Sequence, residues 1–175
     1  IFYKQSLTSN DEINNCVFKE CKATGIGGGV FFESNGGSIV DCEFTSCEAE
    51  FNGGSLTYWN VAKQSDSGIV QRCIFDSKLS LYNPNLLYTT TRIVKEAKVQ
   101  PLKIADCGFY AQENWQNNPG CFLIAAGTGI EFEGTNYMGG DEDSIVWPFS
   151  GKVETSSIIY NADSSDKPSV NPSRP

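Results

Sequence analysis

Seven cysteines are the residues of this chain with the most distinctive chemistry, and their spacing limits what they can do. Zinc sites use closely paired cysteines, as in Cys-x-x-Cys, or cysteine together with histidine. Here the nearest cysteines are five residues apart and the chain contains no histidine. We therefore expect no metal site and no cofactor. We interpret the cysteines as buried thiols and leave disulfides between neighbouring segments open. The seven are Cys16, Cys21, Cys42, Cys47, Cys73, Cys107 and Cys121.

The absence of histidine also removes the commonest general base and every Ser-His or Cys-His nucleophile pair. Glu131 and Glu133 are two residues apart, as are Glu48 and Glu50, which places each pair on one face of an extended strand. Paired carboxylates are the minimum for glycoside hydrolysis, but exposed strands commonly carry acids. The acidic run at 141–143 lacks the spacing of a calcium loop and reads as a solvated turn. We predict no catalytic residue.

Three tryptophans are the candidates for ligand binding, because aromatic faces stack on sugar rings. They are Trp59, Trp115 and Trp147, accompanied by Tyr58, Tyr110 and Tyr137. Aromatic side chains also fill interiors and cover loops, and packing is the more frequent role. Packing is therefore the favoured interpretation, and a sugar-binding platform is the alternative.

Charge and hydropathy exclude some classes of partner. Thirteen basic and twenty-one acidic residues give a formal net charge of -8, which disfavours nucleic acid and anionic membrane surfaces. No apolar run reaches the length of about twenty residues that a membrane helix needs. We expect neither nucleic-acid binding nor a direct membrane span in this chain.

A repeat with a period of about 26 residues organises the first third of the chain. The stretch NCVFKECKATGIGGG from Asn15 is restated as DCEFTSCEAEFNGGS from Asp41, so two cysteines, an alanine and a Gly-Gly pair recur in one register. Weaker copies of the Cys-x-Phe unit follow, and the interval between successive units lengthens along the chain. The repeated residues are Cys16, Cys42, Cys73, Cys107, Phe18, Phe44, Phe75 and Phe109, with Gly27, Gly28, Gly53 and Gly54 at the turns.

Cys and Phe two residues apart share one face of a strand, and the runs are short and bounded by Gly, Asn, Ser and Asp. Identical residues at one period require stacked coils, in which Cys lies on Cys and Phe on Phe. We predict an all-β, right-handed parallel β-helix of about 26 residues or more per coil, with little or no helix. The β-helix spans 1–160 with an insertion around 79–101, and 161–175 is an extended tail rich in Pro and Ser.

These motifs resemble the repeats of polymorphic outer membrane proteins, a branch of the pectin-lyase-like β-helices. That family carries a GGA-[ILV] element and an F-x-x-N element. Gly27-Gly28-Gly29-Val30 and Gly53-Gly54-Ser55-Leu56 resemble the first, with Gly or Ser in place of Ala. Phe18-Lys19-Glu20-Cys21 and Phe44-Thr45-Ser46-Cys47 resemble the second, with Cys in place of Asn, and Phe32-Glu33-Ser34-Asn35 matches it. The resemblance implies a surface protein used in adhesion and carries over no catalytic residue.

Two classes of function remain. The first is a non-catalytic β-helix, at the cell surface or outside the cell, used for adhesion or assembly. Its partners would be a protein or glycan at a surface, or neighbouring subunits stacked on the open coil ends. The alternative is a carbohydrate-active lyase or hydrolase on the same scaffold, which only analogy of fold supports.

Overall fold

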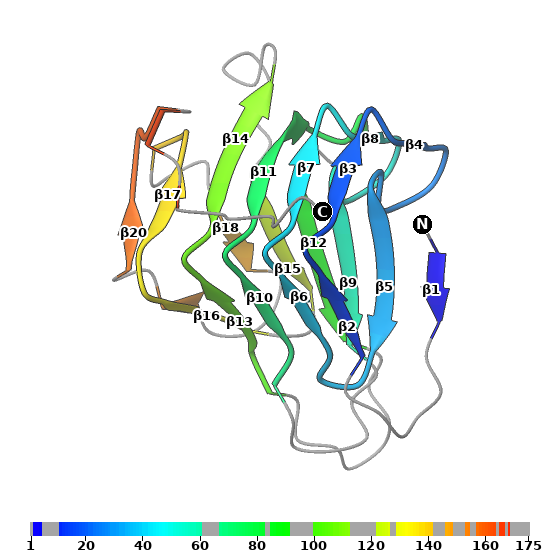
Figure 1. Cartoon of the computed structure of the whole chain (residues 1–175), viewed down its shortest axis with the longest axis horizontal. Coiled ribbons are helices and arrows are strands. Elements are labelled where there is room, and N and C mark those ends of the chain that lie inside the picture. The colour runs from blue at the N-terminus through cyan, green and yellow to red at the C-terminus, as the bar shows by residue number, and fades with distance from the viewer. Residues whose placement is uncertain are drawn as a thin grey trace.

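The chain forms a parallel β-helix in which three sheets run side by side along one axis (Figure 1). The computed structural model describes residues 2–4, 11–60, 67–82, 85–91, 100–112, 122–126, 129–141, 146–148, 153–154, 157–163, 165–166 and 168. All pairings between the described strands are parallel, and the described residues include no helix. The predicted fold class is confirmed.

Each coil contributes one strand to each of the three sheets. Sheet A consists of β1 (Phe2–Lys4), β5 (Val30–Ser34), β9 (Leu56–Asn60), β12 (Leu87–Thr91), β15 (Leu123–Ala126) and β18 (Val146–Pro148). Sheet B consists of β2 (Glu12–Asn14), β6 (Ser38–Val40), β10 (Ile69–Gln71), β13 (Leu102–Ala105), β16 (Ile130–Glu133) and β19 (Val153–Glu154). Sheet C consists of β3 (Val17–Lys19), β7 (Glu43–Thr45), β11 (Ile74–Lys78), β14 (Gly108–Gln112), β17 (Asn136–Met138) and β20 (Ile158–Ile159). A two-stranded sheet D pairs β4 (Lys22–Ala23) with β8 (Glu48–Ala49).

Four phenylalanines form a continuous stack inside sheet C. Phe18 pairs with Phe44, Phe44 with Phe75, and Phe75 with Phe109. The ring centroids are 4.9, 4.8 and 4.7 Å apart, and the planes are within 17° of parallel. This distance equals the spacing of hydrogen-bonded strands, so stacking of the coils fixes stacking of the rings. Met138 continues the column beyond Phe109.

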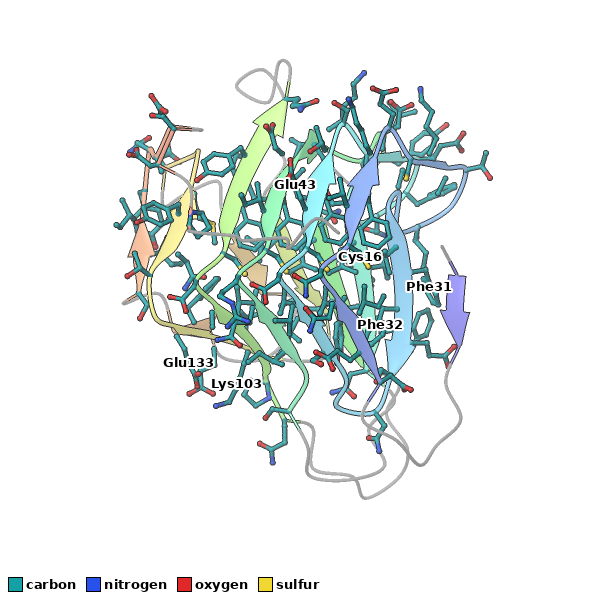
Figure 2. The ribbon with its side chains drawn as sticks, in the orientation of Figure 1. Cys16, Phe31, Phe32, Glu43, Lys103 and Glu133 are labelled. Atoms are coloured by element: carbon teal, nitrogen blue, oxygen red, sulfur yellow. The ribbon has the colours of Figure 1, made fainter. Side chains whose placement is uncertain are left out.

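The column of cysteines lies at the corner between sheets B and C. Cys42, Cys73 and Cys107 are fully buried, while Cys16 in the first coil is half-buried. Each buried thiol lies close to a carbonyl of the preceding coil: Cys42 Sγ is 3.7 Å from Ile13 O, Cys73 Sγ is 3.5 Å from Ile39 O, and Cys107 Sγ is 3.5 Å from Val70 O. Figure 2 shows the sulfur atoms inside the β-helix at the level of Cys16.

A left-handed residue precedes every cysteine of this column. The φ angles are +55° at Asn15, +52° at Asp41, +48° at Arg72 and +54° at Asp106. One residue in this conformation turns the chain from sheet B into sheet C, and Asn and Asp tolerate it better than other residues with a Cβ. Glu20 and Ser46 make the same turn before Cys21 and Cys47.

The predicted turn glycines differ in their roles. Gly27 and Gly53 adopt positive φ angles of +71° and +63°. Gly28 and Gly54 instead meet close backbone: an added Cβ would lie 2.1 Å from Gly54 O and 2.0 Å from Lys78 O, respectively. The first glycine of each pair is therefore required for its backbone conformation, and the second is required because no side chain fits beside the next coil.

Some residues of the expected insertion and of the expected tail are described. The range 79–101 contains β12, a regular strand of sheet A, because its run of Leu, Tyr and Thr has strand character. The described part of the tail packs against the β-helix. Ala162 is buried with Ile74 and Tyr110, and the Tyr110 hydroxyl donates a hydrogen bond of 2.6 Å to Asp166 O.

Candidate binding groove

A groove lies beside sheet D, where short side chains in successive coils leave the surface hollow. Its volume is about 400 Å³. Ala23 pairs with Ala49 in the register of β4 and β8. Because both side chains are small, they do not fill the space between the larger side chains beside them. The pairing continues into the next coil, where Leu81 N donates to Ala49 O (3.1 Å) and Tyr82 N donates to Glu50 O (2.8 Å). The lining residues are Lys22, Ala23, Thr24, Glu48, Ala49, Glu50, Lys78, Leu79 and Leu81.

Glu48 is the charged centre of this groove. Its Oε1 is 3.3 Å from Lys22 Nζ, and its Oε2 is 3.7 Å from Lys78 Nζ. These three side chains come from three successive coils and are 37% to 69% exposed, so each pair contributes little to stability. The arrangement instead presents a row of alternating charges, with both oxygens of the carboxylate facing ammonium groups.

A second hollow of about 460 Å³ is also lined by Lys22 and Ala23. It is lined further by Ile26, Gly27, Gly28, Phe31 and Trp59. Phe31 and Trp59 point to the outside of sheet A, and their rings meet edge to face with centroids 5.9 Å apart. In Figure 2, Phe31 lies on the outer side of β5, opposite the inward Phe32. Trp59 Nε1 is buried and has no hydrogen-bond partner in the described structure.

An apolar corner borders the groove. Of the large apolar side chains that the structure describes, five are exposed, and Phe51, Leu81 and Tyr82 gather at this corner. They are 46%, 67% and 63% exposed, and the rings of Phe51 and Tyr82 lie 5.0 Å apart. Because exposed apolar side chains that cluster mark interaction surfaces, this corner extends the candidate site.

Of the three predicted tryptophans, the structure describes the side chain of Trp59 alone. Trp59 lines the second hollow, Trp115 lies outside the described residues, and Trp147 occupies the β18 position that pairs with Ile124. Tyr58 faces inward and donates a hydrogen bond of 2.7 Å to Gly37 O, and burial raises its pKa. The structure therefore brings Trp59 together with Phe31.

The predicted acidic residues lie on different elements of the fold. Glu48 and Glu50 line the groove, whereas Glu131 and Glu133 lie on β16, where Glu133 accepts a hydrogen bond of 2.5 Å from Lys103 Nζ (Figure 2). Asp141 is exposed, and the other two acids of that run lie outside the described residues. No group of three or more side chains suited to a metal occurs in the described part of the chain, and that part contains no apolar helix long enough to cross a membrane.

Sequence reasoning missed the lysines and the apolar corner. Lys22 and Glu48 occupy equivalent positions of the repeat with opposite charges, and Ala23 and Ala49 beside them are equivalent too, so the repeat contained a signal for the groove. The third coil carries no such signal, because extra residues lengthen the repeat before Lys78, Leu81 and Tyr82.

The chain matches no family model, no curated protein and no solved structure.

Proposed function

We propose that this chain is a non-catalytic β-helix module that binds a partner through its lateral groove, in adhesion or in assembly. The observation that carries the proposal is the apolar corner of Phe51, Leu81 and Tyr82 beside the row of Lys22, Glu48 and Lys78. An apolar centre with charged neighbours is the usual composition of a protein interface. Trp59 and Phe31 give the second hollow an aromatic surface that suits a glycan.

Location at the cell surface or outside the cell belongs to the same proposal. It is supported by the acidic net charge and by the resemblance of the Gly-Gly and Phe-x-x-Cys elements to polymorphic outer membrane protein repeats. For an assembly, the partner would be a neighbouring subunit.

Binding and self-association can be measured on the same variants. Leu81→Ser combined with Tyr82→Ser removes two of the three side chains of the apolar corner without touching the core, because these two side chains are 67% and 63% exposed. Val17→Ser is the matched control, since Val17 is 51% exposed on sheet C. The probes are an array of neutral and acidic glycans, a panel of purified matrix proteins, and sedimentation velocity of the chain alone.

We expect at least one probe to bind or the chain to self-associate, with a loss of tenfold or more in the double variant and none in Val17→Ser. Equal behaviour of the two variants would contradict the proposal. So would the absence of both binding and self-association in the wild-type chain.

A carbohydrate-active enzyme is the second candidate, because Glu48 and Glu50 line one groove with two lysines. Hydrolysis needs one free acid and one free base, and the ion pairs of Glu48 disfavour that use. Incubation with polygalacturonate, alginate and β-glucans, followed by assays for reducing ends and unsaturated uronides, separates the candidates. Release of product that is lost in Glu48→Gln and Glu50→Gln would replace the binding proposal.

A further inference from the structure

Two pairs of cysteines in the first two coils lie directly over one another. Glu43 N donates to Cys16 O and Glu48 N donates to Cys21 O, both at 2.9 Å, so the backbones at Cys16–Cys42 and Cys21–Cys47 are in parallel register. All four are free thiols in this structure. In-register strands hold their Cα atoms about 4.8 Å apart, within the range of about 4.4–6.8 Å that disulfides span.

These pairs differ from the rest of the column in access. Cys16 and Cys21 are half-buried, whereas Cys73 and Cys107 are fully buried. A redox partner in solution therefore reaches the first coil and not the third and fourth. Cys42 and Cys47 lie in the next coil, in register with the accessible thiols, and can act as resolving cysteines.

The first coil also lies at an edge of the described sheets. Among the described residues, β2, β3 and β4 are edge strands of sheets B, C and D, with a paired strand on one side. A disulfide needs Cβ atoms about 3.8 Å apart, which is closer than stacked strands place them. An edge coil can tilt toward its neighbour, whereas Cys73 and Cys107 lie at corners of coils that have a paired coil on both sides.

We propose that Cys16–Cys42 and Cys21–Cys47 are disulfide-forming sites that join the first coil to the second when a low-molecular-weight disulfide such as glutathione disulfide is present. The thiolate of Cys16 or Cys21 attacks one sulfur of glutathione disulfide, and glutathione thiolate leaves. The partner thiolate of Cys42 or Cys47 then attacks the protein sulfur of the mixed disulfide and expels the second glutathione thiolate. Each protein dithiol loses two electrons and two protons, and each glutathione disulfide becomes two molecules of glutathione.

The surroundings of the thiols set how the reaction depends on pH. Burial and the neighbouring Cys42 raise the pKa of Cys16, and burial raises the pKa of Cys47 to about 11. Since the thiolate is the nucleophile, oxidation accelerates between pH 7 and pH 9. The Cys21–Cys47 bridge would lie next to the Lys22–Glu48 pair and would hold the two coils of the groove at a fixed spacing.

Peptide mapping tests the proposal on the wild-type chain. The folded chain is incubated with excess glutathione disulfide, alkylated, and digested with trypsin and a glutamate-specific protease. The four cysteines then fall on separate peptides: 13–19, 21–22, 34–43 and 44–48. Peptides 73–78 and 104–113 report on Cys73 and Cys107.

We expect linked peptides 13–19 with 34–43 and 21–22 with 44–48, together with alkylated 73–78 and 104–113. The oxidised chain should have a higher Tm than the reduced chain, and reduction should reverse the change. Cys73→Ser should leave both links intact, whereas Cys42→Ser should abolish only the first.

Three results would overturn the proposal. The first is full alkylation of all four thiols after oxidation. The second is linkage of Cys73 to Cys107 as fast as that of the outer pairs. The third is linkage only between two chains, which mixing labelled with unlabelled protein would reveal.

Discussion

Arg72 and Asp41 form a bidentate ion pair between successive coils. Arg72 Nε donates to Asp41 Oδ1 and Nη2 donates to Asp41 Oδ2, both at 2.7 Å. Both residues have positive φ angles, at the corner that precedes Cys73 and Cys42. An arginine in this conformation is unusual, and the paired geometry offsets part of the backbone strain.

The coupling between these two residues can be measured with a double-mutant cycle of Arg72→Ala and Asp41→Ala. We expect an interaction free energy of about 0.5–1 kcal/mol, at the upper end for exposed pairs because the contact is bidentate. The Arg72 side chain is 39% exposed, so solvent screening keeps the value small. Urea unfolding of the four proteins provides the measurement, and additive effects would contradict the expected coupling.

The same pair predicts a pH dependence. Hydrogen bonds from Arg72 lower the pKa of Asp41 below its ordinary value of 3.8, which it regains in the unfolded chain. The folded state therefore holds the proton less tightly, and the contribution of Asp41 to stability is complete above pH 3.8. It declines as pH falls through the lowered pKa. The difference in unfolding free energy between wild type and Asp41→Asn should be constant from pH 5 to pH 7 and shrink below pH 4. A constant difference down to pH 2 would contradict this account.

Phe75 is the most informative position of the aromatic column, because its ring is buried between Phe44 and Phe109. Phe75→Ala should destabilise the chain by about 3–5 kcal/mol, since it removes a large side chain and both stacking contacts. Phe51→Ala is the control, because Phe51 is 46% exposed and its loss should cost roughly 0.5 kcal/mol or less. Similar midpoints of urea unfolding for the two variants would be evidence against the buried stack.

Gly28 and Gly25 give a sharp contrast within one turn. Gly28→Ala places a methyl group 2.1 Å from Gly54 O and should prevent close stacking of the first two coils. Gly25→Ala meets no atom within 4 Å and should leave stability unchanged or raise it slightly. Thermal unfolding monitored by circular dichroism distinguishes them: Tm should fall by many degrees in the first variant only. A tolerated Gly28→Ala would indicate that the coils do not stack at the spacing described.

The sequence alone determined the β-helix and much of its register. The intervals between successive members of the series Phe18, Phe44, Phe75 and Phe109 are the pairing offsets of sheet C. Identical residues recur at the coil period because strands stacked without a stagger place equivalent side chains in contact. The Gly-Gly turns follow from the same repeat, since only glycine fits where two backbones approach closely.

Tertiary structure decided the groove, because its residues share no single period. Lys22 and Glu48 are equivalent positions of the repeat, but Lys78, Leu81 and Tyr82 join them only after extra residues shift the third coil. The longer interval between Phe44 and Phe75 predicts which strands pair, but it does not predict the path of the additional residues. The placement of β12 within the expected insertion and the packing of Ala162 against Tyr110 were decided in the same way, by contacts that form only once the coils are stacked.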